Sequence, residues 1–414
     1  MRKNPRRIFT TEYTEEKEDF RIKTPWYSVL SVVNSYLFSL LIAGFLVTLL
    51  SCDFSFKGKP DSEIPGWGMP GTQEPVSWDA AQPLHELYKD YFLMGNIISP
   101  GDITNVRFDI LKRHFNTATA ENDMKPNAIA PLAKGGDYRY TQADRLVTAV
   151  NDAGIKMHGH TLIWHQQTPS WLYTGDKTTV LANLEKFVTD VATHFKGKLI
   201  SWDVVNEAMR DGLSAGDAAD WKTCLRPGGW NIIGPEYIEK AFLAARAADP
   251  DAKLYYNDYS LNSWQGNGKP RAVYNMVRDI NERYPNVGGR PLIDGIGMQS
   301  HHHLNTMPES VEESIVLFSS LGVDITISEM DIMAAKSSDN NLTNTWDDNA
   351  AQLQAQKYAA MFRIFKNHAS KVSRVTFWGL DDRTSWRATS YPTLLDKDYN
   401  LKPAFYAVVN PNSF

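Results

Sequence analysis

The amino-acid sequence predicts an α/β fold, a closed (β/α)8 TIM barrel, as one domain over residues 81–414. Short β-rich runs alternate with longer amphipathic segments of helical spacing, a pattern that indicates a parallel sheet. Eight such repeats fit the length of a barrel with insertions. An open doubly wound sheet is the alternative. It usually brings a Gly-rich phosphate loop after the first strand, and "MGNIISPGD" is not such a loop.

Each predicted strand is a short run rich in β-branched and aromatic residues. The eight runs are residues 91–98, 115–122, 155–165, 198–207, 253–260, 293–301, 323–331 and 374–382. Helix-like stretches separate them, for example residues 234–249 and the stretch that starts at 347–349. Nearly every strand ends in polar or aromatic residues, and in a barrel these ends converge on one face, where active sites lie. One such strand end is ordinary, but all of them together indicate a functional face.

The first 80 residues differ in composition from the rest. Residues 24–52 carry no charge, follow a basic stretch and end in Ser51 and Cys52. This pattern is typical of a bacterial lipoprotein signal, with Cys52 as the lipidated residue. An uncleaved membrane anchor is the alternative, because the span is long enough to cross a bilayer. We therefore expect an exported protein, held at a membrane and facing the cell surface or periplasm of a bacterium.

A linker is expected between this segment and the barrel. Residues 57–75 hold four Pro and four Gly, a composition that buries too little apolar surface to fold and stays extended. The predicted organisation is a signal or anchor over 1–52, a linker over 53–80 and a catalytic domain over 81–414.

Composition and cysteine content exclude several kinds of protein. A net charge of −5, with no basic stripe beyond the first 25 residues, argues against a nucleic-acid partner. The two cysteines, Cys52 and Cys224, do not make a disulfide framework, and Cys224 is expected to be an inert thiol. The run His301–His303 does not predict a metal site, because only alternate strand residues face one side and no further ligand cluster completes a set. No metal or cofactor is expected.

Two carboxylates stand at the ends of predicted strands. Glu207 ends the fourth strand and Glu329 ends the seventh, so the two side chains can face one cavity across the barrel. A carboxylate pair across a cleft serves glycoside hydrolysis, in which one group protonates the leaving oxygen and the other attacks or activates water. Asn206, just before Glu207, is placed to reach a sugar 2-hydroxyl.

Six motifs, in this order, resemble those of glycoside hydrolase family 10, the endo-β-1,4-xylanases. They are "AENDMKP", "HGHTLIWHQQTPSW", "WDVVNEA", "GIGMQSHH", "ITISEMD" and "FWGLDDRTSW", and the resemblance covers about residues 83–410. It implies that Glu207 is the general acid/base and Glu329 the nucleophile of a retaining enzyme, with the carboxylates about 5 Å apart. It also implies a set of substrate-binding residues: Glu121, Asn122, Lys125, His160, Trp164, Gln167, Asn206, Gln299, His301, Trp378 and Trp386.

The resemblance implies an endo-1,4-β-xylanase acting on xylan and xylo-oligosaccharides, and we expect a monomer. A β-1,4-glucanase, or mixed specificity, is the alternative, and Trp378 is the candidate wall against the hydroxymethyl group of glucose. A non-catalytic glycan-binding protein is disfavoured because both carboxylates are present. Two positions depart from the family pattern: Pro126 follows Lys125 in place of the usual Trp, and Ser328 precedes Glu329 in place of the commoner Thr. Pro126 puts the position of Lys125 in question.

Overall fold

The computed structural model describes residues 76–414, apart from 264–265, 335, 339–340 and 344–345. These residues belong to one unit, Glu74–Phe414. The predicted signal or anchor over 1–52, including Cys52, and most of the predicted linker lie outside the described residues and stay predictions. Within the described part of the chain, no helix is long and apolar enough to span a membrane.

Eight parallel strands form the predicted closed barrel. They are β1 (Leu93–Ile98), β2 (Thr117–Ala120), β3 (Lys156–Ile163), β4 (Ser201–Asn206), β5 (Lys253–Asp258), β6 (Gly295–Met298), β8 (Asp324–Met333) and β11 (Val372–Phe377). Each pairs with the next barrel strand along the chain, and β11 pairs with both β8 and β1. This last pairing closes the ring, so the open-sheet alternative is wrong. The residues of these eight strands fall within the predicted runs, except for the last two of β8 and the first two of β11.

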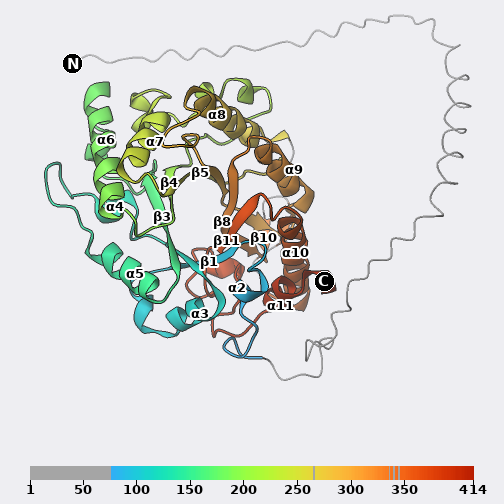
Figure 1. Cartoon of the computed structure of the whole chain (residues 1–414). Helices are drawn as coiled ribbons and strands as arrows, with labels where there is room; N and C mark the ends of the chain where they lie inside the picture. Colours follow the sequence, from blue (N-terminus) through green and yellow to red (C-terminus); the bar gives the residue numbers. More distant parts are fainter. Residues whose placement is uncertain (1–75, 264–265, 335, 339–340, 344–345) are drawn as a thin grey trace, which may run out of the picture. The chain divides into compact units, whose positions relative to one another are not determined.

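Helices lie around the outside of the barrel (Figure 1); the first of them precedes β1 and the others follow strands. They are α2 (Leu84–Leu87), α3 (Val106–His114), α4 (Pro126–Ile129), α5 (Thr141–Asp152), α6 (Lys177–His194), α7 (Tyr237–Ala248), α8 (Lys269–Arg283), α9 (Pro308–Ser319), α10 (Asp348–Asn367) and α11 (Pro403–Val409). The helix α10 starts where it was predicted, because the side chain of Asp347 caps it by accepting from the Ala350 N–H.

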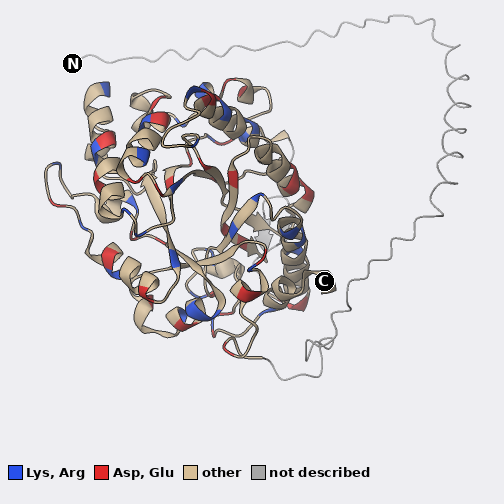
Figure 2. Cartoon of the chain, viewed as in Figure 1, with Lys and Arg blue, Asp and Glu red and all other residues tan. Residues whose placement is uncertain are grey.

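The core lies in the layer between the strands and these helices. Phe187, Phe242, Phe318 and Phe362, from four different helices, are fully buried there. Lys, Arg, Asp and Glu residues are interspersed along the helices that surround the barrel (Figure 2). The helices therefore present an apolar stripe to the barrel and a polar face to water.

The strand predicted over 293–301 is divided in two. The barrel strand β6 ends at Met298, and Ser300 takes a left-handed conformation with φ of 61°. The chain then forms β7 (His301–His303), which pairs with the end of β8 and sets His301 opposite Asp331. After β8, the strands β9 (Lys336–Ser338) and β10 (Asn341–Thr343) form an antiparallel pair that the sequence did not predict.

Glycine makes room inside the barrel at two positions that matter for the site. A Cβ on Gly159 would lie 2.2 Å from the ring of Trp202, which is fully buried. A Cβ on Gly297 would lie 2.3 Å from Oδ1 of Asn257. Both distances are shorter than any tolerated contact, so larger residues at these positions would displace the neighbouring side chains.

Candidate active site

One cleft at the carboxyl ends of the strands is lined by all thirteen side chains that the sequence predicted for the site. Its volume is about 730 Å³. The side chains come from the ends of six barrel strands and from β7, as expected where parallel strands converge. They are Glu121, Asn122, Lys125, His160, Trp164, Gln167, Asn206, Glu207, Gln299, His301, Glu329, Trp378 and Trp386.

Glu207 directly follows β4 and is held mainly by neutral groups. Its Oε2 accepts from Nε1 of Trp164 at 2.8 Å, and its Oε1 accepts from Nε2 of Gln299 at 2.9 Å. Nδ1 of His165 lies 3.9 Å from Oε2. Burial, reinforced by the charge of Arg226, lowers the pKa of His165 to about 4, so this imidazole is neutral at neutral pH. These contacts orient the carboxyl group for proton exchange with a substrate oxygen without pairing it with a cation.

Glu329, within β8, has different partners. Its Oε1 accepts from Nδ2 of Asn257 at 2.7 Å, and its Oε2 lies 3.3 Å from Nε2 of His301. Nδ1 of His301 lies 3.0 Å from Oδ2 of Asp331. Burial opposes the charged imidazole, but the two carboxylates outweigh it and raise the pKa of His301 to about 9. A cation and an amide therefore both contact the Glu329 side chain, an arrangement that suits a carboxylate nucleophile.

Ser328, one of the two departures from the family pattern, orients the amide that holds Glu329. Its Oγ donates to Oδ1 of Asn257 at 2.6 Å, which leaves Nδ2 of Asn257 directed at Glu329. The hydroxyl alone makes this contact, so the methyl group of Thr is not needed for it.

Pro126, the second departure, leaves Lys125 in the cleft. It begins α4, where a proline ring suits the first helical turn. Lys125 is 6% exposed; its Nζ donates to Oδ1 of Asn122 at 2.9 Å and lies 5.1 Å from the centroid of the Trp164 ring. A hydrogen bond and a cation–π contact therefore buttress the ammonium group.

Two tryptophans form aromatic walls. Trp378, directly after β11, is buried and meets His160 edge to face at 5.3 Å. Trp386 is 56% exposed; its Nε1 donates to Oδ2 of Asp331 at 2.9 Å and its ring meets His301 at 4.9 Å. Fixed aromatic faces of this kind stack against sugar rings.

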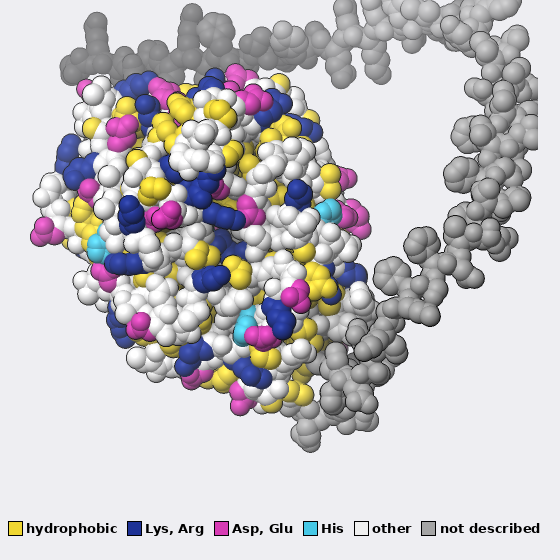
Figure 3. Space-filling model, in the orientation of Figure 1, with side chains coloured by type: hydrophobic (Ala, Val, Ile, Leu, Met, Phe, Trp, Pro, Cys, Tyr) yellow, Lys and Arg dark blue, Asp and Glu magenta, His cyan; other side chains and the backbone are white. Residues whose placement is uncertain are grey.

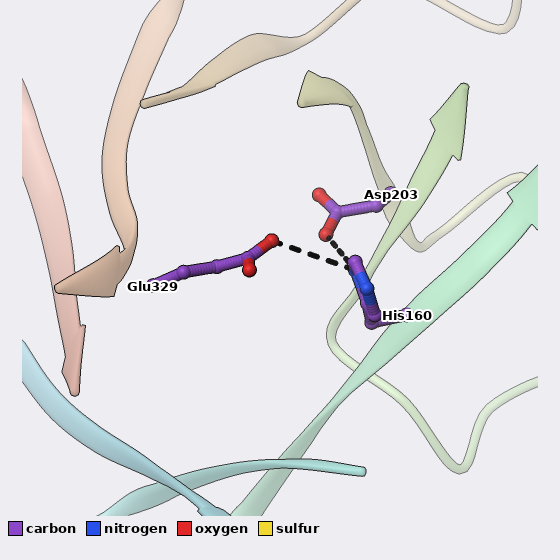
Figure 4. A group of neighbouring side chains, drawn as sticks. All are labelled: His160, Asp203 and Glu329. Atoms are coloured by element: carbon purple, nitrogen blue, oxygen red, sulfur yellow. Dashed lines mark hydrogen bonds and ion pairs between the residues drawn. The ribbon is translucent and has the colours of Figure 1, made fainter. Parts of the chain in front are cut away.

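Three of the polar groups lie close enough to raise the question of a metal ion. Figure 4 shows His160, Asp203 and Glu329, whose donor atoms all lie within 4.8 Å of one another. Nδ1 of His160 lies 2.9 Å from Oδ2 of Asp203 and 4.0 Å from Oε1 of Glu329. Burial alone would raise the pKa of Asp203, but the facing imidazoles of His158 and His160 lower it below its ordinary range. Each of the three side chains has a hydrogen-bond or ion-pair partner, although Oδ1 of Asp203 is buried without one.

Both arginines that line the cleft are paired with carboxylates. Arg226 lies 3.2 Å from Asp211, and Arg387 lies 3.1 Å from Asp331. On the face seen in Figure 3, Lys and Arg side chains gather over the centre of the ring with Asp and Glu among them. This mutual neutralisation suits an uncharged ligand better than an ionic one.

Several residues that line the cleft were not predicted from the sequence. Arg226 donates from Nε to the carbonyl oxygen of Glu207 at 2.9 Å, although it lies 19 residues further along the chain in a segment without regular spacing. Asp211 shares this irregular segment, and no sequence signal pointed to either residue. His165 directly follows the predicted Trp164, and Arg387 directly follows the predicted Trp386, so their positions beside motif residues could have identified them.

Comparison with known proteins agrees with this geometry. Residues 83–411 match the profile described as Glycosyl hydrolase family 10. Endo-1,4-beta-xylanase A of Thermotoga maritima is 37% identical over 380 residues, covering 88% of this chain but 32% of that protein. Beta-1,4-xylanase of Dictyoglomus thermophilum is 39% identical over 336 residues, covering 79% of this chain and 90% of that protein. The chain thus spans about a third of the first relative and most of the second.

A solved structure is similar as well. An intracellular xylanase of Thermoanaerobacterium saccharolyticum, solved as a mutant in complex with xylotetraose, is 33% identical with a TM-score of 0.70. The match covers 80% of this chain and 99% of that one.

Proposed function

The chain belongs to glycosyl hydrolase family 10, and on this basis we propose that it is a retaining endo-1,4-β-xylanase. It hydrolyses internal β-1,4-xylosidic bonds of xylan and xylo-oligosaccharides by double displacement. One observation carries the proposal: Glu207 and Glu329 share a cleft but have unlike partners. Neutral donors hold Glu207, whereas the His301 cation and an amide hold Glu329. Unlike surroundings are what separate an acid from a nucleophile.

In the first step Glu329 attacks the anomeric carbon while Glu207 protonates the leaving oxygen. The glycosidic C–O bond breaks, the leaving chain departs with the proton, and a sugar ester forms on Glu329. In the second step Glu207 takes a proton from water, the water oxygen attacks the anomeric carbon, and the ester bond breaks. Two inversions at one carbon return its original configuration.

The proposed substrate is supported by the walls of the cleft and by the relatives. Trp378 is buried beside His160, which leaves little room for the extra hydroxymethyl group of glucose. Both relatives described above carry the name xylanase, and the similar solved structure holds xylotetraose.

Product analysis on xylan, arabinoxylan and carboxymethylcellulose, side by side, tests this function. We expect short xylo-oligosaccharides from xylan and arabinoxylan, and little product from carboxymethylcellulose. Faster release of sugars from carboxymethylcellulose than from xylan would contradict xylan as the substrate. Glu329→Ala should abolish hydrolysis, and azide should restore it with inverted product. Glu282→Ala, which changes an exposed glutamate on α8, is the matched control. Near-wild-type turnover in Glu329→Ala would contradict the assignment of Glu329 as the nucleophile.

We also propose that Cys52 is lipidated and that the enzyme is exported and works at the bacterial membrane as a monomer. The uncharged run over 24–52 supports the anchor. Of the exposed large apolar side chains of the described residues, only Met307 and Val316 share a segment, at α9, and this scatter supports a monomer. Cys52→Ala should release the enzyme from the membrane fraction and abolish labelling by a radioactive fatty acid. Membrane retention without any label in the wild type would favour an uncleaved anchor.

A further inference from the structure

The backbone that carries Glu207 is held in an unusual conformation by β5. Glu207 has a φ of 55°, in the left-handed region that residues other than glycine seldom adopt. Its own N–H donates to the carbonyl of Asn257 at 2.8 Å. The next two N–H groups, of Ala208 and Met209, both donate to the hydroxyl oxygen of Tyr256, at 3.1 and 3.2 Å. Such a turn persists only where its surroundings hold it.

The hydroxyl of Tyr256 uses its full hydrogen-bonding capacity. It donates to Oδ2 of Asp258 at 2.5 Å while accepting from the two N–H groups. A hydroxyl has one proton to donate and two lone pairs to accept, so no capacity is left over. The tyrosine is fully buried, and water is therefore no ready substitute for any of these partners.

A buried ion pair orients this hydroxyl. Oδ1 of Asp258 accepts from Nζ of Lys269 at 2.8 Å and from the Tyr259 N–H at 2.9 Å. Asp258 is fully buried and Lys269 is 2% exposed, with its Nζ 3.6 Å from the centroid of the Tyr259 ring. A carboxylate that faces three donors acts as an acceptor only. It therefore draws the Tyr256 proton to itself and turns both hydroxyl lone pairs towards Ala208 and Met209.

We propose that Tyr256, oriented by the Asp258–Lys269 ion pair, is the positioning residue for the acid/base Glu207. This inference rests on the proposed function. Without the hydroxyl, two buried N–H groups and one carboxylate oxygen lose their partners, and the left-handed turn relaxes. The Glu207 carboxyl then leaves the place set by Trp164 and Gln299. Protonation of the leaving oxygen suffers first, because it requires hydrogen-bond distance in the transition state.

The test compares substrates that differ in how much their leaving oxygen needs a proton. Aryl xylobiosides with a poor leaving group (phenol) need the acid, whereas those with a good one (dinitrophenol) need little of it. For Tyr256→Phe we expect kcat/KM on the phenyl glycoside to fall by about 10- to 100-fold, a part of what a general acid contributes. On the dinitrophenyl glycoside the expected loss is less than about 3-fold.

The adjacent residue provides a matched control. Tyr255 is also buried on β5, but its hydroxyl donates to Oδ2 of Asp324 at 2.7 Å, at the start of β8 and away from Glu207. Tyr255→Phe removes a buried hydroxyl too, so a general loss of stability appears in both variants. We expect Tyr255→Phe to affect the two glycosides equally. Thermal unfolding of both variants measures the stability difference directly.

A second variant and a second background complete the test. Lys269→Met leaves Asp258 without its cation and should reproduce the leaving-group dependence; it carries the test if Tyr256→Phe does not fold. In a Glu207→Ala background, Tyr256→Phe should cost nothing further on the dinitrophenyl glycoside, because the group it positions is gone. Equal losses on both glycosides in Tyr256→Phe and Lys269→Met would overturn the inference. If the wild type hydrolyses neither glycoside, the proposed function itself fails, and the inference falls with it.

Discussion

The imidazole of His301 is expected to make the stability of the protein depend on pH between about 6.5 and 9. Its folded pKa of about 9 lies above the ordinary 6.5, so the folded state keeps a proton that the unfolded state has lost. The stabilisation is complete below pH 6.5 and disappears as pH rises through 9. At about 1.4 kcal/mol per pKa unit, it amounts to roughly 3 kcal/mol. The groups facing the ring are Glu329, Asp331, Trp386 and, through Asp331, Arg387.

His301→Gln removes this titration while keeping a polar side chain. Urea unfolding of the wild type and the variant at pH 6 and at pH 9.5 gives two differences in unfolding free energy, in which other titrating groups largely cancel. We expect the wild-type advantage to shrink by on the order of 3 kcal/mol at the higher pH. His302→Gln is the control, because burial lowers the pKa of folded His302 to about 3. Only the unfolded state then takes up a proton at this histidine near pH 6, so the wild-type advantage over this variant should not shrink as the pH rises. A His301→Gln difference that is the same at both pH values would refute the ion-pair reasoning.

Three further predictions concern the acid/base Glu207, the aromatic wall residue Trp378 and Gly159 inside the barrel. Glu207→Ala should reduce hydrolysis of xylan far more than that of a dinitrophenyl xylobioside, and equal losses would contradict the acid role. Trp378→Ala should raise the ratio of kcat/KM on aryl cellobioside to that on aryl xylobioside, and an unchanged ratio would show that Trp378 is not the wall. Gly159→Ala should destabilise the fold by about 2 kcal/mol or more, since its methyl group would enter the Trp202 ring; thermal unfolding at the wild-type temperature would contradict this.

The sequence by itself was enough to predict the barrel and the residues that line the cleft. Strand and helix periodicities alternate because each strand is buried on both sides and each helix on one, and that pattern is legible without coordinates. Glu207 and Glu329 could be assigned to one cavity because the carboxyl ends of parallel strands converge. The family resemblance then supplied the more distant members, such as Trp386, and the structure places them at the same cleft. Their individual roles stay predictions.

The family resemblance assigned different roles to the two carboxylates, but only the tertiary structure decided which groups surround each of them. The partners of Glu329, His301 and Asn257, lie 28 and 72 residues away along the chain. The hydroxyl of Tyr256, which holds the turn after Glu207, comes from a different strand. A sequence states which residue types are present and how they are spaced. Charge, burial and hydrogen bonding depend on distances between segments that meet only after folding, so they set the chemistry of each carboxylate where no local pattern records it.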